Sequence, residues 1–222
     1  MPGEFSKDES KTNQIWQVMI AFALGAVCFL ATQVFTRVPL LGWLQKQPIF
    51  VTWTMSFPLL SGVMTALSAG VFEESGRFAF KSFLLKPEKS PFWESVVFGL
   101  GHGLCEAVWV LIPVFGRLIL ISPGKFILPI VERLLAIIMH IGLSVIVWNG
   151  FQLNKRWQYL LAAILTHGLV NALIPLAGIL GWGILQLEGL FAGITGLFLI
   201  YVIYSRKYYI EKESYETSTP ID

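Results

Sequence analysis

Long apolar runs, separated by short polar segments, set the pattern of this sequence. Most runs contain about 20 residues, which is enough for an α-helix to cross the hydrocarbon core of a bilayer. The pattern therefore predicts an all-α fold, a polytopic membrane helix bundle of about six transmembrane helices. The spans are expected at about residues 16–35, 57–80, 92–114, 128–148, 157–177 and 183–204.

Two stretches are expected to interrupt the helices. The second apolar run would measure about 55 Å as one straight helix, so Pro58 is expected to kink it or to separate an interfacial piece from the span. Residues 36–48 are expected to form a loop, because proline and glycine punctuate them. A further turn is expected at Asn149-Gly150.

The composition indicates a membrane protein of one domain. Hydrophobic residues make up 55% of the 222 residues and charged residues only 14%, whereas soluble domains carry about 25% charged residues. Residues 1–222 are expected to form a single integral membrane domain, with polar cytoplasmic tails at 1–14 and 205–222. The absence of a long basic run argues against a nucleic-acid partner.

The lysine and arginine positions predict that both termini lie inside, in a multi-pass protein of the cell membrane. With the N-terminus inside, the inner segments carry eleven of these residues and the outer loops carry four. The inner residues are Lys7, Lys11, Arg77, Lys81, Lys86, Lys89, Lys155, Arg156, Arg206, Lys207 and Lys212, and the outer residues are Arg37, Lys46, Arg117 and Lys125.

A few ionisable residues lie deep inside the apolar runs. The second span contains Glu73-Glu74-Ser-Gly-Arg77, and the chain has three histidines. The histidines are His102, His140 and His167, one in each of the next three spans. Ionisable side chains inside a membrane are costly and are therefore usually functional. All lie about 10–15 Å from the inner helix ends, so we expect them to form one hydrophilic site within the bundle.

Each of these helices also carries a polar partner four residues further on, which lies on the same helix face. The pairs are Glu73/Arg77, His102/Glu106, His140/Ser144 and His167/Asn171. Nearer the outer boundary, Glu132 and Arg133 are expected to form a structural pair, and Glu188 lies close to that boundary.

These residue types support water-activated hydrolysis of an amide bond. Glu73 or Glu74 can act as a general base, and an asparagine amide or a neutral imidazole can donate a hydrogen bond to the oxyanion. Alternatively, histidines and a glutamate can bind zinc, which acidifies a water molecule. The candidate zinc ligands are His102, His140, His167 and Glu106. The sequence contains no HExxH motif.

Three motifs, in order on successive helices, carry a resemblance to a known family. They are Glu73-Glu74-x-x-Arg77, Phe98-x-x-x-His102 and His167-x-x-x-Asn171. They resemble the EExxxR, FxxxH and HxxxN/D motifs of the CPBP (CAAX-protease and bacteriocin-processing, or Abi) intramembrane proteases. The arginine is one residue closer, a spacing similar to EExxK in the PrsW-type proteases. The glycines around the first histidine look most like the YhfC-type bacterial branch.

The resemblance implies an intramembrane protease of the glutamic or metallo type that cleaves a membrane-embedded or lipid-anchored peptide. The implied catalytic residues are Glu73, Glu74, His102, His167 and Asn171, with Arg77 and Phe98 as supporting residues. The first glutamate is the base in the CPBP group, but the closer arginine keeps Glu74 as an equal candidate. Zinc is the cofactor that the metallo type would use.

Two other functions are compatible with histidines and glutamates inside a helix bundle. Such residues can carry protons or divalent metal ions across the membrane, as in a transporter. The same fold could also serve a non-enzymatic immunity or regulatory protein. A cavity that opens sideways to lipid favours a protease, whereas a cavity that alternates between the two membrane faces favours transport.

Overall fold

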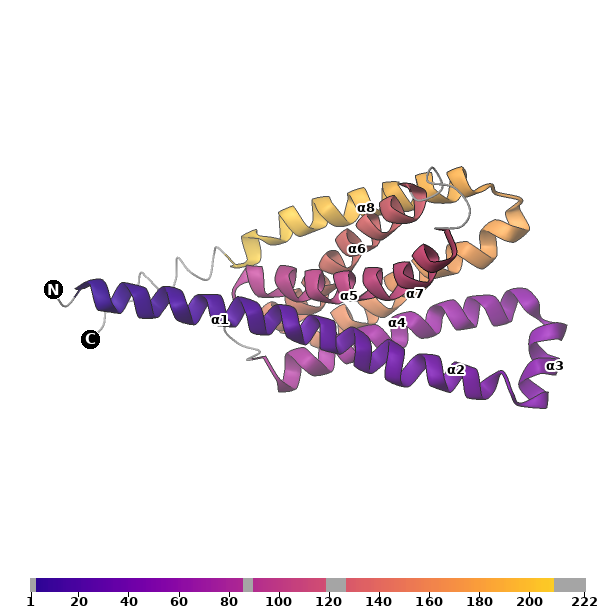
Figure 1. Ribbon diagram of the computed structural model, residues 1–222, viewed down its shortest axis with the longest axis horizontal. Coiled ribbons are helices and arrows are strands. Elements are labelled where there is room, and N and C mark those ends of the chain that lie inside the picture. The colour runs from indigo at the N-terminus through magenta and orange to yellow at the C-terminus, as the bar shows by residue number, and fades with distance from the viewer. Residues whose placement is uncertain (1–2, 86–89, 119–126, 210–222) are drawn as a thin grey trace.

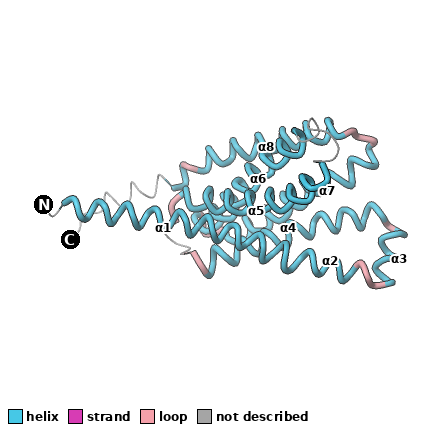
Figure 2. Tube along the Cα trace, viewed as in Figure 1, coloured by secondary structure: helices cyan, strands magenta, loops and turns pink. Residues whose placement is uncertain are grey.

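The computed structural model describes residues 3–85, 90–118 and 127–209, and this part of the chain is helical, with short turns and no β-strand (Figures 1 and 2). The elements are α1 (Gly3–Phe29), the π-helical segment η1 (Leu30–Arg37), α2 (Val38–Leu44), α3 (Pro48–Ser56), α4 (Pro58–Phe83), α5 (Phe92–Leu118), α6 (Ile127–Gln152), α7 (Arg156–Leu180) and α8 (Ile184–Ser205). Helix α1, η1 and α2 follow one another along one side of the bundle (Figure 1).

Among the described residues, five helical segments are long and apolar enough to cross a membrane. They are Thr12–Leu44, Phe92–Pro113, Ile127–Gln152, Arg156–Leu180 and Ile184–Tyr209. A sixth span arises if α3 and α4 are taken together, although they are bent by 114°. The predicted all-α bundle of about six spans is confirmed, and the chain breaks at Pro58 as predicted.

The predicted loop at residues 36–48 is wrong, because the first helical segment continues to Leu44. Pro39 does not stop it, since η1 directly precedes it and such a local π-helical adjustment lets a membrane helix accommodate a proline. The preceding segment η1 is wound as a π-helix, a form that is often found at functional sites. The chain therefore turns only at residues 45–47, just before α3.

The predicted turn at Asn149-Gly150 is also wrong, because α6 continues to Gln152. The side-chain Nδ2 of Asn149 donates to the hydroxyl groups of Tyr201 and Ser205, at 2.8 Å each. These bonds to α8 satisfy a buried amide that would otherwise favour a turn. The asparagine thus links two helices instead of ending one.

The predicted polar tails differ in their outcome. The stretch 1–14 contains the first turns of α1, which begins at Gly3. Most of the stretch 205–222 lies outside the described residues, which end at Tyr209.

Glycines let the helices that carry the polar residues approach closely. Helix α4 packs against α7, and α5 packs between α1 and α6. A Cβ atom at Gly70 would lie 2.4 Å from the carbonyl oxygen of Ile164, and one at Gly101 would lie 2.1 Å from that of Phe22. Both contacts are shorter than any real Cβ contact, so only glycine permits this spacing.

A buried ion pair fixes the last turn of α4. Lys81 Nζ lies 2.7 Å from Glu94 Oε1, and the indole Nε1 of Trp148 donates to the same oxygen at 2.9 Å. Lys81 is fully buried, so it does not mark a solvated exit of the helix. Trp148 also packs on the buried ring of Phe98, with ring centroids 5.0 Å apart. This contact forms part of the apolar core beneath the polar site.

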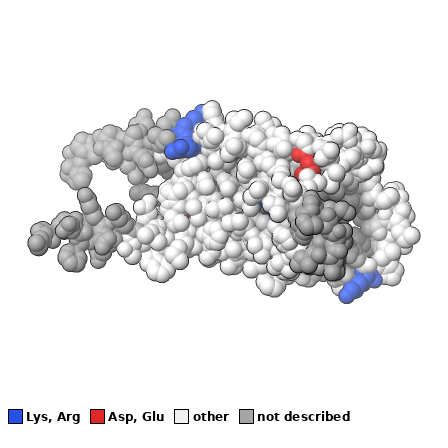
Figure 3. All heavy atoms as spheres, turned by 45° about the horizontal axis from the view of Figure 1, so that its top comes forward, with Lys and Arg blue, Asp and Glu red and all other residues white. Residues whose placement is uncertain are grey.

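The outer surface of the bundle is apolar. On the face in Figure 3, few charged side chains reach the surface. Helix α8, for example, exposes several large apolar side chains. They include Leu185, Leu197, Ile200 and Ile203. Such an exterior suits contact with lipid, while the glutamates, the arginine and the histidines of the predicted site, Glu73, Glu74, Arg77, His102, His140 and His167, are buried inside.

Candidate functional site

A cavity of about 390 Å³ lies inside the bundle, between η1, α4, α5, α6, α7 and α8. Its polar lining residues are Gln33, Arg37, Thr65, Glu73, Glu106, Glu132, Arg133, His140, His167, Asn171 and Glu188. Apolar side chains such as Met139, Val170 and Phe191 complete the wall. Polar residues from separate spans therefore meet in one space, as their depth in the sequence predicts.

Glu73 and His102 form a buried pair at the cavity wall. The Nε2 atom of His102 lies 2.9 Å from Glu73 Oε2, and only 2% of Glu73 is exposed. The ring of Phe29 contacts His102 edge-on, with ring centroids 5.5 Å apart. Nδ1 of His102 has no hydrogen-bond partner among the described residues. Glu73 lines the cavity, and His102 lies behind it.

Glu74 has different surroundings, although it follows Glu73 directly. It is fully buried, and its carboxylate accepts hydrogen bonds from Arg77 Nη1 and, at 2.7 Å, from Nδ1 of His167. It is not among the residues that line the cavity. The guanidinium group neutralises this carboxylate, so Glu74 holds two neighbouring side chains in place rather than facing the cavity.

A chain of contacts continues from Arg77 to the other wall of the cavity. Arg77 Nη2 lies 3.3 Å from Nδ1 of His140, whose Nε2 contacts Glu106. Because a guanidinium group can only donate, Nδ1 of His140 accepts this bond. A neutral His140 therefore carries its proton on Nε2 and donates it to Glu106.

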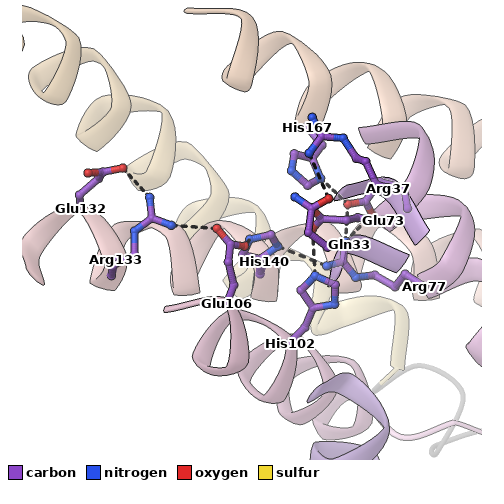
Figure 4. A network of polar contacts seen from close by, with 11 residues as sticks. Gln33, Arg37, Glu73, Arg77, His102, Glu106, Glu132, Arg133, His140 and His167 are labelled. Atoms are coloured by element: carbon purple, nitrogen blue, oxygen red, sulfur yellow. Dashed lines mark hydrogen bonds and ion pairs between the residues drawn. The ribbon is translucent and has the colours of Figure 1, made fainter. Parts of the chain in front are cut away.

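Arg133 connects this chain to the rim of the cavity. Its Nη1 lies 2.8 Å from Glu106 Oε1, and its Nη2 pairs with Glu132 (Figure 4). The expected pair of Glu132 and Arg133 is thus present, but Arg133 also binds a residue that the sequence places in the site. The polar network runs without interruption from the rim to the buried Glu74.

Four of these residues bring their ligand atoms within 4.8 Å of one another. They are Glu73, His102, Glu106 and His140. Two carboxylates and two imidazoles are a donor set that suits zinc, and Nε2 of His102, which contacts Glu73, can bind a metal ion when the ring proton lies on Nδ1. The residues therefore fit a metal ion. If Nε2 of His140 bound the metal ion, the ring proton would lie on Nδ1. Nδ1 could then no longer accept the hydrogen bond from Arg77, so this contact would be lost.

This donor set differs from the ligands that the sequence suggests. His167 is not a member of the group, since its Nδ1 contacts Glu74, and Glu73 takes its place. The rings of His140 and His167 are nevertheless close, with centroids 5.5 Å apart. His167 thus lies beside the possible metal site and on the cavity wall.

The other two motif residues lie in different places. Asn171 lies one helical turn beyond His167, is partly buried and lines the cavity. Phe98 lies one turn before His102, but it is fully buried in the apolar core and does not line the cavity. Asn171 can therefore contact a molecule in the cavity, whereas Phe98 can only support the helix that carries His102.

Two polar residues of the cavity, Gln33 and Arg37, are not among the predicted site residues. Both come from η1, and Arg37 Nη1 donates to Gln33 Oε1 at 3.0 Å. Arg37 is expected in an outer loop because Pro39 follows it. The signal that could have revealed both is their spacing of four residues at the end of an apolar run, which places them on one helix face.

Comparisons with known proteins relate the chain to one family. The chain matches the sequence model of a family described as YhfC intramembrane metalloprotease, over residues 11–122 and 111–195. It is similar to the "Uncharacterized membrane protein YhfC" of Bacillus subtilis (strain 168), at 29% identity over 53% of this chain and 57% of that relative. The match thus spans little more than half the length of this relative. No solved structure matches the chain.

Proposed function

The chain belongs to the YhfC intramembrane metalloprotease family, and on that premise we propose that it hydrolyses a peptide bond of a membrane-embedded or lipid-anchored substrate. The observation that carries the proposal is the buried pair of Glu73 and His102 on the wall of an internal cavity. A peptide bond inside the bilayer is shielded from bulk water. The polar cavity within apolar helices would hold the water that this reaction requires.

Glu73 is the proposed general base. Its carboxylate borders the cavity, where it would accept a proton from the attacking water. His102 orients this carboxylate through the contact of 2.9 Å. Glu74 is the weaker candidate, because its carboxylate already binds Arg77 and His167. The two glutamates therefore have different proposed roles, because their carboxylates bind different partners.

His167 and Asn171 are the proposed donors to the oxyanion that forms during hydrolysis. Both line the cavity, and the contact with Glu74 fixes the ring of His167. An imidazole N–H or a side-chain amide aimed at the developing charge stabilises it most strongly where water is excluded. This arrangement of a glutamate base and His/Asn donors supports a relationship to the CPBP proteases.

A metal-bound site is the alternative version of the proposal, because Glu73 and His102 cannot bind a metal ion and also keep the contact that orients the base. Glu73, His102, Glu106 and His140 would hold the ion, since their ligand atoms lie within 4.8 Å of one another. A bound zinc ion supplies Lewis acidity, which polarises a carbonyl group and makes water a stronger nucleophile. Arg133 would hold Glu106 in position through its contact of 2.8 Å.

The replacement Glu73→Gln tests the proposal. Glutamine preserves size but cannot accept the proton, so cleavage of a membrane-peptide library in proteoliposomes is expected to fall about 10²–10⁴-fold. Glu4→Gln, far from the cavity in sequence, serves as a matched control and should cleave at the wild-type rate. Cleavage by Glu73→Gln at the wild-type rate would exclude the glutamate base. Uptake of zinc or protons without cleavage would instead favour a transporter.

A further inference from the structure

Arg37 is a cation of the cavity that the proposed reaction does not use. It is the last residue of η1, lines the cavity and is partly buried. Three hydrogen bonds fix its guanidinium group. Nε donates to Ser68 Oγ at 2.9 Å, Nη1 donates to Gln33 Oε1 at 3.0 Å, and Nη2 donates to the carbonyl oxygen of Thr65 at 2.7 Å. The group is therefore held in one orientation against α4.

Its hydrogen bonds leave two donors unused among the described residues. A guanidinium group has five N–H donors, and the three bonds leave one N–H on Nη1 and one on Nη2. A carboxylate commonly binds one N–H from each of two guanidinium nitrogens. The fixed group thus has the donors that a carboxylate ligand needs.

The charge of Arg37 is also uncompensated by contact. Its three acceptors are uncharged, whereas Arg77 binds Glu74 and Arg133 binds Glu106. Among the described residues, no carboxylate lies within 4.0 Å of its nitrogen atoms, and the carboxylate that acts on its charge, that of Glu73, does so through space and not by contact. A cation inside a membrane bundle usually has an anionic partner. An anion that enters the cavity would supply it.

The depth of Arg37 in the bundle determines which kind of anion can reach its guanidinium group. The helical rod continues for seven residues beyond it, to Leu44, which corresponds to about 10 Å. Thr65, which accepts its hydrogen bond, likewise lies about 10 Å along α4 from Pro58. With the helix ends at Leu44 and Pro58 taken as the membrane boundary, the guanidinium group lies below the level of lipid phosphates. A peptide chain can carry a carboxylate to this depth, and the carboxylates of the cavity disfavour a dianionic phosphate more strongly than a monoanion.

We propose that Arg37 binds a carboxylate of the substrate peptide and so positions the bond to be cleaved. This inference rests on the proposed function and adds a substrate class to it. Thr65 and Ser68 precede Glu73 by eight and five residues, so the guanidinium lies about 10 Å from the base along α4. An extended peptide spans about 3.3 Å per residue. The carboxylate is therefore expected about three residues from the cleaved bond.

Binding to the inactive variant Glu73→Gln tests this inference without requiring catalysis. The probes are two fluorescent, acylated apolar peptides that differ only in one residue, aspartate or asparagine, three positions from the centre. Fluorescence anisotropy in neutral-lipid nanodiscs should show about 10-fold or tighter binding of the aspartate peptide, as for a charge-assisted hydrogen bond. Adding Arg37→Gln should abolish this preference, and adding Arg37→Lys should retain part of it. Adding Lys46→Gln, a cation outside the cavity, should leave it unchanged.

The alternative outcomes are separable. Equal binding of the two peptides, or an aspartate preference that survives Arg37→Gln in a protein with unchanged Tm, would overturn the inference. A dependence on Arg37 that appears only with anionic lipids would assign the residue to lipid phosphate and would also overturn it. Cleavage of the asparagine peptide by the wild-type protein depends on the proposed function alone, so the two proposals can fail separately.

Discussion

Replacing Glu74 by glutamine is expected to destabilise the bundle far more than the same replacement of Glu73. Glu74 is fully buried and accepts hydrogen bonds from Arg77 and His167. Glutamine has nearly the same size, but its neutral amide leaves the buried guanidinium group without a counter-charge. Glu73 pairs with His102, which needs no counter-charge when it is neutral.

The magnitude follows from these contacts. Breaking a buried ion pair by removing one partner costs about 3–5 kcal/mol. For a chain of this size, Tm changes by about 2–4 °C per kcal/mol, so Glu74→Gln should lower Tm by roughly 6–20 °C. Glu73→Gln weakens a single hydrogen bond, worth about 1 kcal/mol, and should lower Tm by only a few degrees.

Thermal unfolding of the purified protein in detergent, followed by tryptophan fluorescence, measures this difference. Glu132→Gln is the control, because the Glu132 side chain is 38% exposed and such pairs contribute about 0–1 kcal/mol. A wild-type Tm for Glu74→Gln would refute the assignment of this residue to the buried ion pair. An equally large loss for Glu73→Gln would refute the separation of roles between the two glutamates.

Three further outcomes are expected. Gly70→Ala should lower Tm, because the added Cβ atom would clash with α7 at a cost of about 1–3 kcal/mol. Gly178→Ala is the control and should leave Tm unchanged, since nothing in the described part of the chain lies within 4 Å of its added Cβ atom. Equal Tm values for the two variants would count against the close packing of α4 and α7. The purified protein should contain zinc by atomic absorption and His102→Ala should lose most of it; equal zinc content would argue against the metal site. Single cysteines at Lys46 and Lys155 should label from opposite sides of the membrane, and labelling of position 155 from outside intact cells would contradict the inward N-terminus.

The sequence predicts the bundle well because membrane helices have a direct signature. Apolar length fixes the existence of each span, and the cost of buried charge identifies the polar residues that must face inward. The loop predicted at residues 36–48 is wrong because the effect of a proline depends on the helix around it. Pro58 begins a new helix, while Pro39 follows the π-helical segment η1 and the helix continues through it.

The candidate site is harder to predict than the fold. Depth along the helices indicates that the polar residues meet, but not which atoms form pairs. Rotation of the helices decides that Glu73 faces the cavity while Glu74 faces Arg77. Arg37 is not predicted as a site residue because a loop is expected at that position. The depth of a loop residue in the membrane cannot be counted along a helix. Its place in the cavity depends on a helix that continues through Pro39.

Hydrolysis in water enriched in ¹⁸O tests the central claim most directly. Purified protein in proteoliposomes would be incubated with a membrane-peptide library, and new peptide ends would be analysed by mass spectrometry. If Glu73 activates water for peptide-bond hydrolysis, the wild-type protein should generate new carboxyl ends that carry ¹⁸O, and Glu73→Gln should generate almost none. Absence of labelled ends with the wild-type protein, or equal labelling with both proteins, would contradict a Glu73-dependent intramembrane peptidase.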